Sequence, residues 1–72
     1  MWYKSLVLDK FSKGDEILII TESDLSYKGV LLDAEDNVIS LCQDIGDEGM
    51  ITIFIEYSNI DSIGLFEKTQ RK

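Results

Sequence analysis

The sequence lacks histidine and proline, and it has one cysteine, Cys42, among its 72 residues. Without further cysteine or histidine, the chain cannot form an internal disulfide, a zinc-finger ligand set or a histidine-based catalytic site. Its longest apolar run, 17–20, is far shorter than the roughly 20 residues that span a bilayer, and no basic-then-apolar signal segment opens the sequence. We therefore expect a cytoplasmic protein that is not an enzyme, needs no metal or other cofactor, and has no membrane partner.

Positive charge is scarce in the middle of the chain. Residues 14–67 contain 13 acids against Lys28 alone, whereas segments 1–13 and 68–72 carry +2 and +3, so that the net charge is −7. Nucleic-acid affinity rests largely on Lys and Arg side chains that displace counterions, so an acidic body disfavours contact with phosphate. The acidic excess is interpreted either as a solubilising surface or as a body whose phosphate contacts are confined to its basic ends.

The length and composition predict one small globular domain over residues 1–72. Apolar residues make up 44% of the chain and charged residues 29%, which is too hydrophobic for a disordered segment. Within residues 1–12, Trp2 with Leu6 and Val7 with Phe11 have the spacing of one helical face, which predicts a short N-terminal helix. A strand through residues 5–8 is the alternative. Residues 67–72 are predicted to form a basic tail.

Residues 15–66 have the pattern of short strands rich in Ile, Val, Leu and aromatic side chains. The links between them are short, polar and turn-prone, so neighbouring strands should be antiparallel and form a meander. Five short strands of this kind bend into a small barrel. The acidic link 44–49 is predicted to be a solvated hairpin turn rather than a cation site, and Cys42 is predicted to be a small hydrophobe within a strand. The predicted strands are 15–21, 26–32, 37–43, 50–56 and 60–66.

Two of these strands are more hydrophobic than expected for a barrel in which each strand has one buried face and one solvent-exposed face. In 50–55, Ile51, Ile53 and Ile55 alternate onto one face, yet Phe54 lies on the other. The apolar run 17–20 poses the same problem in the first strand. Cover must come from the N-terminal helix or from another subunit, and the edges of an open sheet are themselves pairing surfaces. Both points predict an oligomer.

Three segments resemble the first motif of the Sm-like family: Lys13-Gly14-Asp15-Glu16-Ile17-Leu18-Ile19, Tyr27-Lys28-Gly29-Val30-Leu31 and Asp36-Asn37-Val38-Ile39-Ser40-Leu41. The second has the aromatic-x-Gly-x-Leu pattern of that motif. The resemblance covers most of the chain. It implies a mainly β fold, in which a short N-terminal helix precedes a small SH3-like barrel of five strongly bent antiparallel strands. It also implies a homo-oligomeric ring of five to seven subunits, in which the fourth strand of one subunit pairs with the fifth of the next. The chain is similar, too, to small Sm-like proteins of bacteriophages, cyanophages among them.

The family's second motif is matched by Ile55-Glu56-Tyr57-Ser58-Asn59-Ile60, with two departures. Glu56 stands where the family has an Arg that contacts RNA, and Tyr57 stands where it has Gly. The resemblance implies a platform for single-stranded RNA with pore loops at Asp36, Asn37, Tyr57 and Asn59, and an aromatic such as Tyr57 can stack on a base. A carboxylate at position 56 repels phosphate, whereas the family's Arg attracts it. A protein partner is therefore the rival ligand.

The resemblance further implies that the subunit interface is filled by apolar residues of the last two strands, namely Phe54, Ile63, Leu65 and Phe66. A monomeric SH3-like adaptor barrel, which binds a peptide or a protein partner, is the alternative function. Catalysis is not expected, because no nucleophile with its base can be assembled from these residues.

Overall fold

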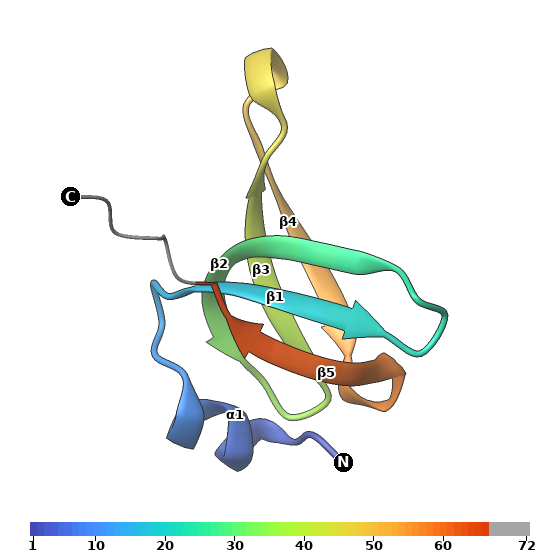
Figure 1. The fold of residues 1–72 in the computed structure, drawn as a ribbon. Coiled ribbons are helices and arrows are strands. Elements are labelled where there is room, and N and C mark those ends of the chain that lie inside the picture. The colour runs from blue at the N-terminus through green and yellow to red at the C-terminus, as the bar shows by residue number, and fades with distance from the viewer. Residues whose placement is uncertain (67–72) are drawn as a thin grey trace, which may run out of the picture.

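The computed structural model describes residues 1–66, which form one five-stranded antiparallel sheet and a short α-helix (Figure 1). The predicted basic tail, 67–72, lies outside the described residues. Two single-turn 3₁₀ helices, Gly46–Glu48 and Tyr57–Asn59, occupy links that the sequence analysis treats as turns. The helix and the strands are α1 (Lys4–Lys10), β1 (Glu16–Thr21), β2 (Ser26–Ala34), β3 (Val38–Asp44), β4 (Met50–Glu56) and β5 (Ile60–Leu65).

The five predicted strands are confirmed, with ends that differ by no more than two residues. The largest difference is at β2, which continues to Ala34 because its register with β3 shifts between Leu31 and Asp33. At this bulge the buried Ser40 hydroxyl donates a hydrogen bond to the Asp33 carbonyl at 3.3 Å. The N-terminal element is a helix, so the alternative strand through residues 5–8 is wrong, although the helix is shorter than the predicted 1–12.

The strand order is β4-β3-β2-β1-β5, and every neighbouring pair is antiparallel. A simple meander would place β5 beside β4, and this part of the prediction is wrong. The 3₁₀ turn Tyr57–Asn59 instead carries the chain across the curled sheet to the free side of β1, where Glu22 N–H donates to the Asn59 carbonyl at 2.8 Å. As a result, β4 and β5 form the two edges of the sheet.

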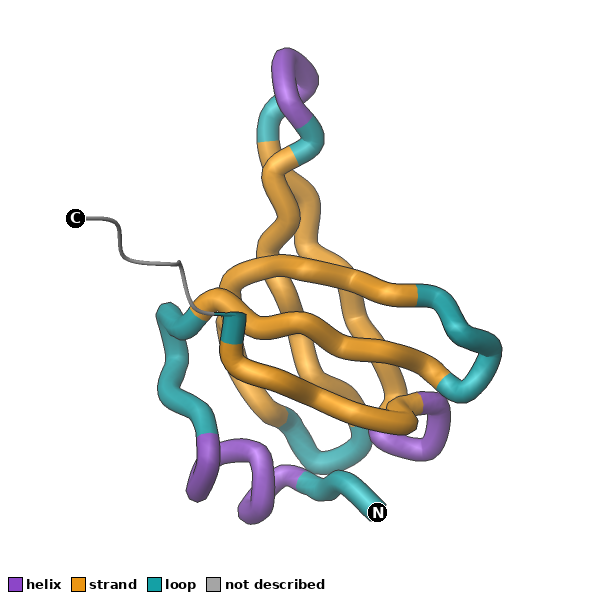
Figure 2. The backbone as a smooth tube through the Cα atoms, viewed as in Figure 1, coloured by secondary structure: helices purple, strands orange, loops and turns teal. Residues whose placement is uncertain are grey.

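The core lies inside the curl of the sheet, and α1 covers one end of it (Figure 2). Val7 of α1 is fully buried, and Phe11 just after the helix is buried beside Trp2, with ring centroids 6.2 Å apart. The helix therefore supplies part of the cover that the sequence analysis required. The remaining buried apolar residues are Ile17, Ile19, Leu31, Ala34, Ile39, Leu41, Ile55, Tyr57 and Ile60.

Gly29 of β2 lies directly against the main chain of β3. A Cβ atom at this position would lie 2.7 Å from the carbonyl oxygen of Cys42, inside van der Waals contact with main chain. Cys42 lies in β3, as predicted, and is half-buried. The glycine is thus required by the approach of the two backbones, since a side chain here would force β2 and β3 apart.

The β3–β4 hairpin projects from the body of the sheet, and we call residues 43–51 the arm (Figure 1). Its tip closes with a hydrogen bond of 2.8 Å from Ile45 N–H to the Gly49 carbonyl, and Gly49 adopts φ of 102°, a conformation that favours glycine. The predicted hairpin turn is confirmed. Three large apolar side chains of the arm are exposed: Ile45, Met50 and Ile51.

Candidate functional site

Two loops predicted to form a ligand site lie together in the structure. The Tyr57 N–H donates a hydrogen bond to the Asn37 carbonyl at 3.1 Å, and the Tyr57 hydroxyl donates to the Glu35 carbonyl at 2.7 Å. Asn37, Glu56 and Tyr57 line one shallow depression. The β2–β3 loop and the turn after β4 are therefore joined as one surface, as the sequence predicts for the pair Asn37 and Tyr57.

The other two predicted ligand residues lie apart from that depression. The Asp36 side chain points to solvent with an exposed fraction of 90%, and its Oδ1 atom lies 3.7 Å from Lys4 Nζ. Asn59 lines a separate groove beside β4. The Tyr57 ring is only 7% exposed, so it serves here as part of the core and as a tie between loops. Base stacking by Tyr57 stays a prediction, and it would require the ring to leave the core.

Acidic side chains dominate the surface near these loops. Lys13 Nζ lies 3.3 Å from Asp33 Oδ1, and this contact, with the Ala34 N–H bond to the same carboxylate, lowers the pKa of Asp33 below its ordinary 3.8. Lys4 is likewise beside Asp36. Both lysines near the loops thus already face carboxylates, while Glu56 is exposed. The local field does not favour a phosphate-bearing ligand.

The Tyr57 hydroxyl is expected to make the stability of the fold sensitive to alkaline pH. Burial raises its pKa above the ordinary 10.0, and nearby Asp33, Asp36 and Glu35 add to the effect. Because the folded-state pKa is the higher one, the contribution is complete below about pH 10 and is lost as pH rises through the folded value.

We therefore expect the free energy of unfolding of the wild-type protein to fall between pH 8 and pH 11. In the Tyr57→Phe variant it should fall less over the same range, because the titrating hydroxyl is absent. At pH 8 the variant should lose about 1 kcal/mol, since it leaves the Glu35 carbonyl without its donor. Urea unfolding at the two pH values measures both effects. Tyr3→Phe is the matched control, because Tyr3 is 55% exposed. A Tyr57→Phe profile parallel to the wild-type profile would contradict the assignment.

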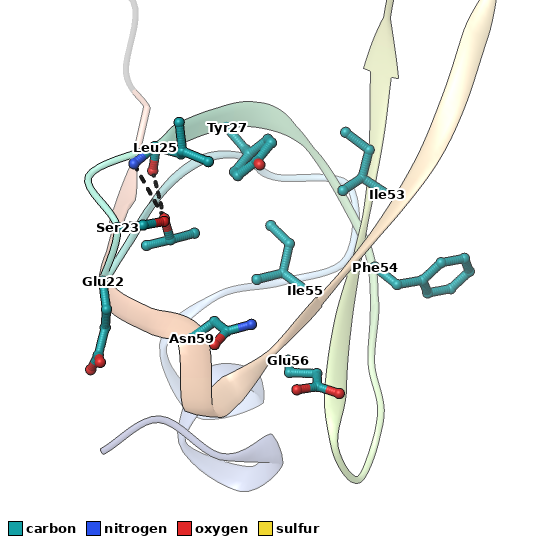
Figure 3. Close-up of a pocket in the computed structure, with 10 residues that line it drawn as sticks. Glu22, Ser23, Leu25, Tyr27, Ile53, Phe54, Ile55, Glu56 and Asn59 are labelled. Carbon is teal, nitrogen blue, oxygen red and sulfur yellow. Dashed lines mark hydrogen bonds between the residues drawn. The ribbon is translucent and has the colours of Figure 1, made fainter.

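The second candidate surface is a groove of about 800 Å³ between β4 and the turn that follows β1 (Figure 3). Ile55 points into this space and Phe54 points away from it. Glu22 and Glu56 place negative charge at its rim. The turn is fixed by Thr21, whose buried hydroxyl accepts a hydrogen bond from Leu25 N–H at 3.2 Å. The apolar side chains that line the groove are Leu25, Tyr27, Ile53 and Ile55.

The main chain of β4 has a regular set of groups that face away from β3. Hydrogen-bonded and non-hydrogen-bonded pairs alternate along an antiparallel ladder. Ile45 bonds to Gly49 at one end of the β3–β4 ladder and Tyr57 bonds to Asn37 at the other, with an unbroken register between them. The odd-numbered residues of β4 therefore face β3. The outward-facing main-chain groups belong to Met50, Thr52, Phe54 and Glu56.

The same argument applies to β5 at the opposite edge. Phe66 N–H donates to the Glu16 carbonyl at 2.8 Å, and the pairing with β1 alternates from that point back along β5. The main-chain groups of Ser62 and Gly64 therefore face β1, up to the register shift near Ile60. Ile63 and Leu65 direct their main-chain groups away from the sheet.

The four predicted interface residues lie on these two edges or next to them. Phe54 on β4 is 62% exposed, and Leu65 on β5 is 48% exposed. Phe66, directly after β5, is 40% exposed, with Lys28 Nζ 4.1 Å from its ring centroid. Ile63 is partly buried against the core. The structure thus places Phe54 at one edge of the sheet and the other three residues at the opposite edge.

Comparison with protein-family models, curated proteins and solved structures found no match. Within residues 1–66, no helix is long and apolar enough to cross a membrane. The same residues contain no group of three or more Cys, Asp or Glu side chains placed to hold a metal ion. The two sheet edges and the acidic groove are therefore the features on which a functional proposal rests.

Proposed function

We propose that the protein is a non-enzymatic, Sm-like binding platform, built as a closed ring of identical copies. The β4 edge of each copy pairs with the β5 edge of the next. The observation that carries this proposal is the pair of strands, β4 and β5, whose outer edges no other strand of residues 1–66 covers, with exposed apolar side chains beside both. Exposed edges of this kind are normally covered or used for pairing between chains.

The side-chain directions at the two edges are complementary. Residues directly opposed across an antiparallel pair place their side chains on the same face of the joint sheet. Phe54 lies on the face of β4 away from its own core, whereas Ile63 faces its own core opposite the buried Ile19. Pairing β4 with β5 of the next copy would place Phe54 over the Ile63 side of that neighbour's core. Phe54 then receives the cover that a single copy does not provide.

The contact is head-to-tail, because it joins two different edges. Contacts of this type form a closed ring when the rotation between copies permits and an open filament when it does not. The strong curl of the sheet turns successive copies relative to one another, which favours closure. The resemblance to the Sm-like family supplies the expected number of five to seven copies.

The ligand that the charges favour for this platform is a basic polypeptide segment. Glu56 lies beside Asn37 and Tyr57 in the shallow depression, and Glu22 and Glu56 border the groove. These carboxylates attract Lys and Arg side chains and repel phosphate. Single-stranded RNA is the ligand that the resemblance implies. Salt-dependent binding of a U-rich or A-rich strand to the assembled protein would return RNA to first place.

The solution mass tests the ring directly. Light scattering coupled to size exclusion, at low and high salt, should give five to seven times the 8.2 kDa of one chain. A mass of two chains would contradict the ring, because a head-to-tail contact between two different edges does not close with two copies of this kind. A mass of one chain, maintained at high protein concentration, would overturn the proposal in favour of the monomeric SH3-like adaptor.

A further inference from the structure

We propose that the basic segment 67–72 of each copy lies along the arm of the neighbouring copy and strengthens the assembly. This inference rests on the proposed ring and specifies a second part of its subunit contact. The surface is the exposed apolar arm, 43–51, and its occupant is the C-terminal segment of a second copy. Three observations lead to it: the direction of the edge strands, the position where β5 ends, and the opposite charges of the two segments.

The strand direction sets where the C-terminal segment goes. Every neighbouring pair in this sheet is antiparallel, and antiparallel pairing is the more stable kind per residue. An antiparallel β5 from the next copy begins beside Glu56 and ends beside Met50. Since Met50 belongs to the arm and is the residue at which β4 begins, the chain that continues past Leu65 of the neighbour heads along the arm.

The length of the segment is sufficient for this contact. Six residues follow Phe66, and an extended chain of six residues reaches about 20 Å at roughly 3.3 Å per residue. From Ile51, where the arm begins on the β4 side, to Glu48 in its turn is four residues, or at most about 13 Å by the same measure. The neighbour's segment can therefore follow the arm over its whole length.

The arm and the segment have opposite charges. The arm contains Asp44, Asp47 and Glu48 and no cation, and all three side chains are exposed. The segment 67–72 contains three cations against Glu67 and so carries +2. The exposed apolar side chains of Ile45, Met50 and Ile51 offer a surface on which the aliphatic stems of Lys and Arg can pack. In the sequence, the basic residues follow β5, which is the part of the chain that antiparallel pairing would direct toward the neighbour's acidic arm.

The test compares assembly among charge variants of the full-length protein. The arm variant is Asp47→Lys with Glu48→Lys, the tail variant is Lys68→Glu with Arg71→Glu, and the swapped protein carries all four changes. A chain ending at Phe66 removes the segment. The readout is the protein concentration at which half of the copies are assembled, measured by light scattering at about 0.05 M salt and at about 1 M salt, where the Debye length is about 3 Å.

At low salt, the arm variant, the tail variant and the shortened chain should each require about a 5-fold higher concentration to assemble, as expected for a few exposed ion pairs. The swapped protein should assemble nearly as well as wild type, and the differences should largely vanish at high salt. All these substitutions lie at exposed or terminal positions, and circular dichroism checks that each variant is folded.

The outcomes separate this inference from the ring itself. Wild-type protein that assembles, with all variants assembling at the same concentration, would overturn the arm contact and leave the ring intact. Assembly that weakens in both single variants without recovery in the swapped protein would also contradict the contact. A wild-type protein that stays monomeric would overturn the ring, and the arm contact with it.

Discussion

Replacing Gly29 by alanine should lower the free energy of unfolding by about 3 kcal/mol, at the upper end of what overpacking usually costs. The added Cβ would lie 2.7 Å from the Cys42 carbonyl oxygen and 3.3 Å from its carbon. Both are main-chain atoms, so relief requires β2 and β3 to move apart rather than a side chain to turn. Urea unfolding at a fixed protein concentration measures the loss.

Gly64→Ala is the matched control for this prediction. Gly64 also lies in a strand, β5, yet a Cβ atom built there has no neighbour within 4 Å. We expect this variant to be as stable as wild type or slightly more stable, because alanine restricts the unfolded chain. Equal losses for Gly29→Ala and Gly64→Ala would show that strand glycines matter here for some reason other than close approach of β2 to β3.

Replacing Thr52 by proline should abolish the assembly while the fold of each copy remains. The Thr52 main chain faces away from β3, so the proline removes an outward N–H donor and leaves the β3–β4 ladder intact. The neighbour's β5 loses a hydrogen bond and meets the proline ring. We expect a cost of about 3 kcal/mol per interface, or roughly a 100-fold loss of pairing affinity. Light scattering follows the mass, and circular dichroism follows the fold.

Thr52→Val keeps the N–H and nearly the same side-chain shape, and it should assemble as wild type does. Ile53→Pro marks the other limit, because the Ile53 main chain faces β3 and its loss should unfold the hairpin. An assembly of normal mass from Thr52→Pro would mean that β4 is not the pairing edge. In that case Phe54 would not be covered by the β5 strand of a neighbouring copy.

The strands could be predicted from the sequence because each one carries its own signal. Alternating aliphatics separated by polar turns placed all five, and Met50–Glu56 was placed with both ends correct. For the apolar run 17–20, a strand covered on both faces was one interpretation. In β1, which lies between β2 and β5, Ile17 and Ile19 are fully buried while Leu18 and Ile20 are half-buried.

The position of β5 and the role of Tyr57 could not be read from local pattern. β5 pairs with β1, some 40 residues away in sequence, because the curled sheet brings the free side of β1 to the end of the turn Tyr57–Asn59. The hydroxyl of Tyr57 reaches the Glu35 carbonyl for the same reason. The identity of Tyr57 suggests stacking, whereas its burial and its hydrogen bond depend on tertiary contacts between distant loops.

The edge position of β4 also has a consequence for a single copy of the chain. Residues 51–55, Ile-Thr-Ile-Phe-Ile, form an uncharged, proline-free stretch of high β-propensity, the composition typical of fibril-forming segments. Glu48 before it and Glu56 after it act as gatekeepers, since stacking copies in register would align like charges. The acidic side chains that disfavour a phosphate-bearing ligand are therefore expected to disfavour stacking of single copies into fibrils as well.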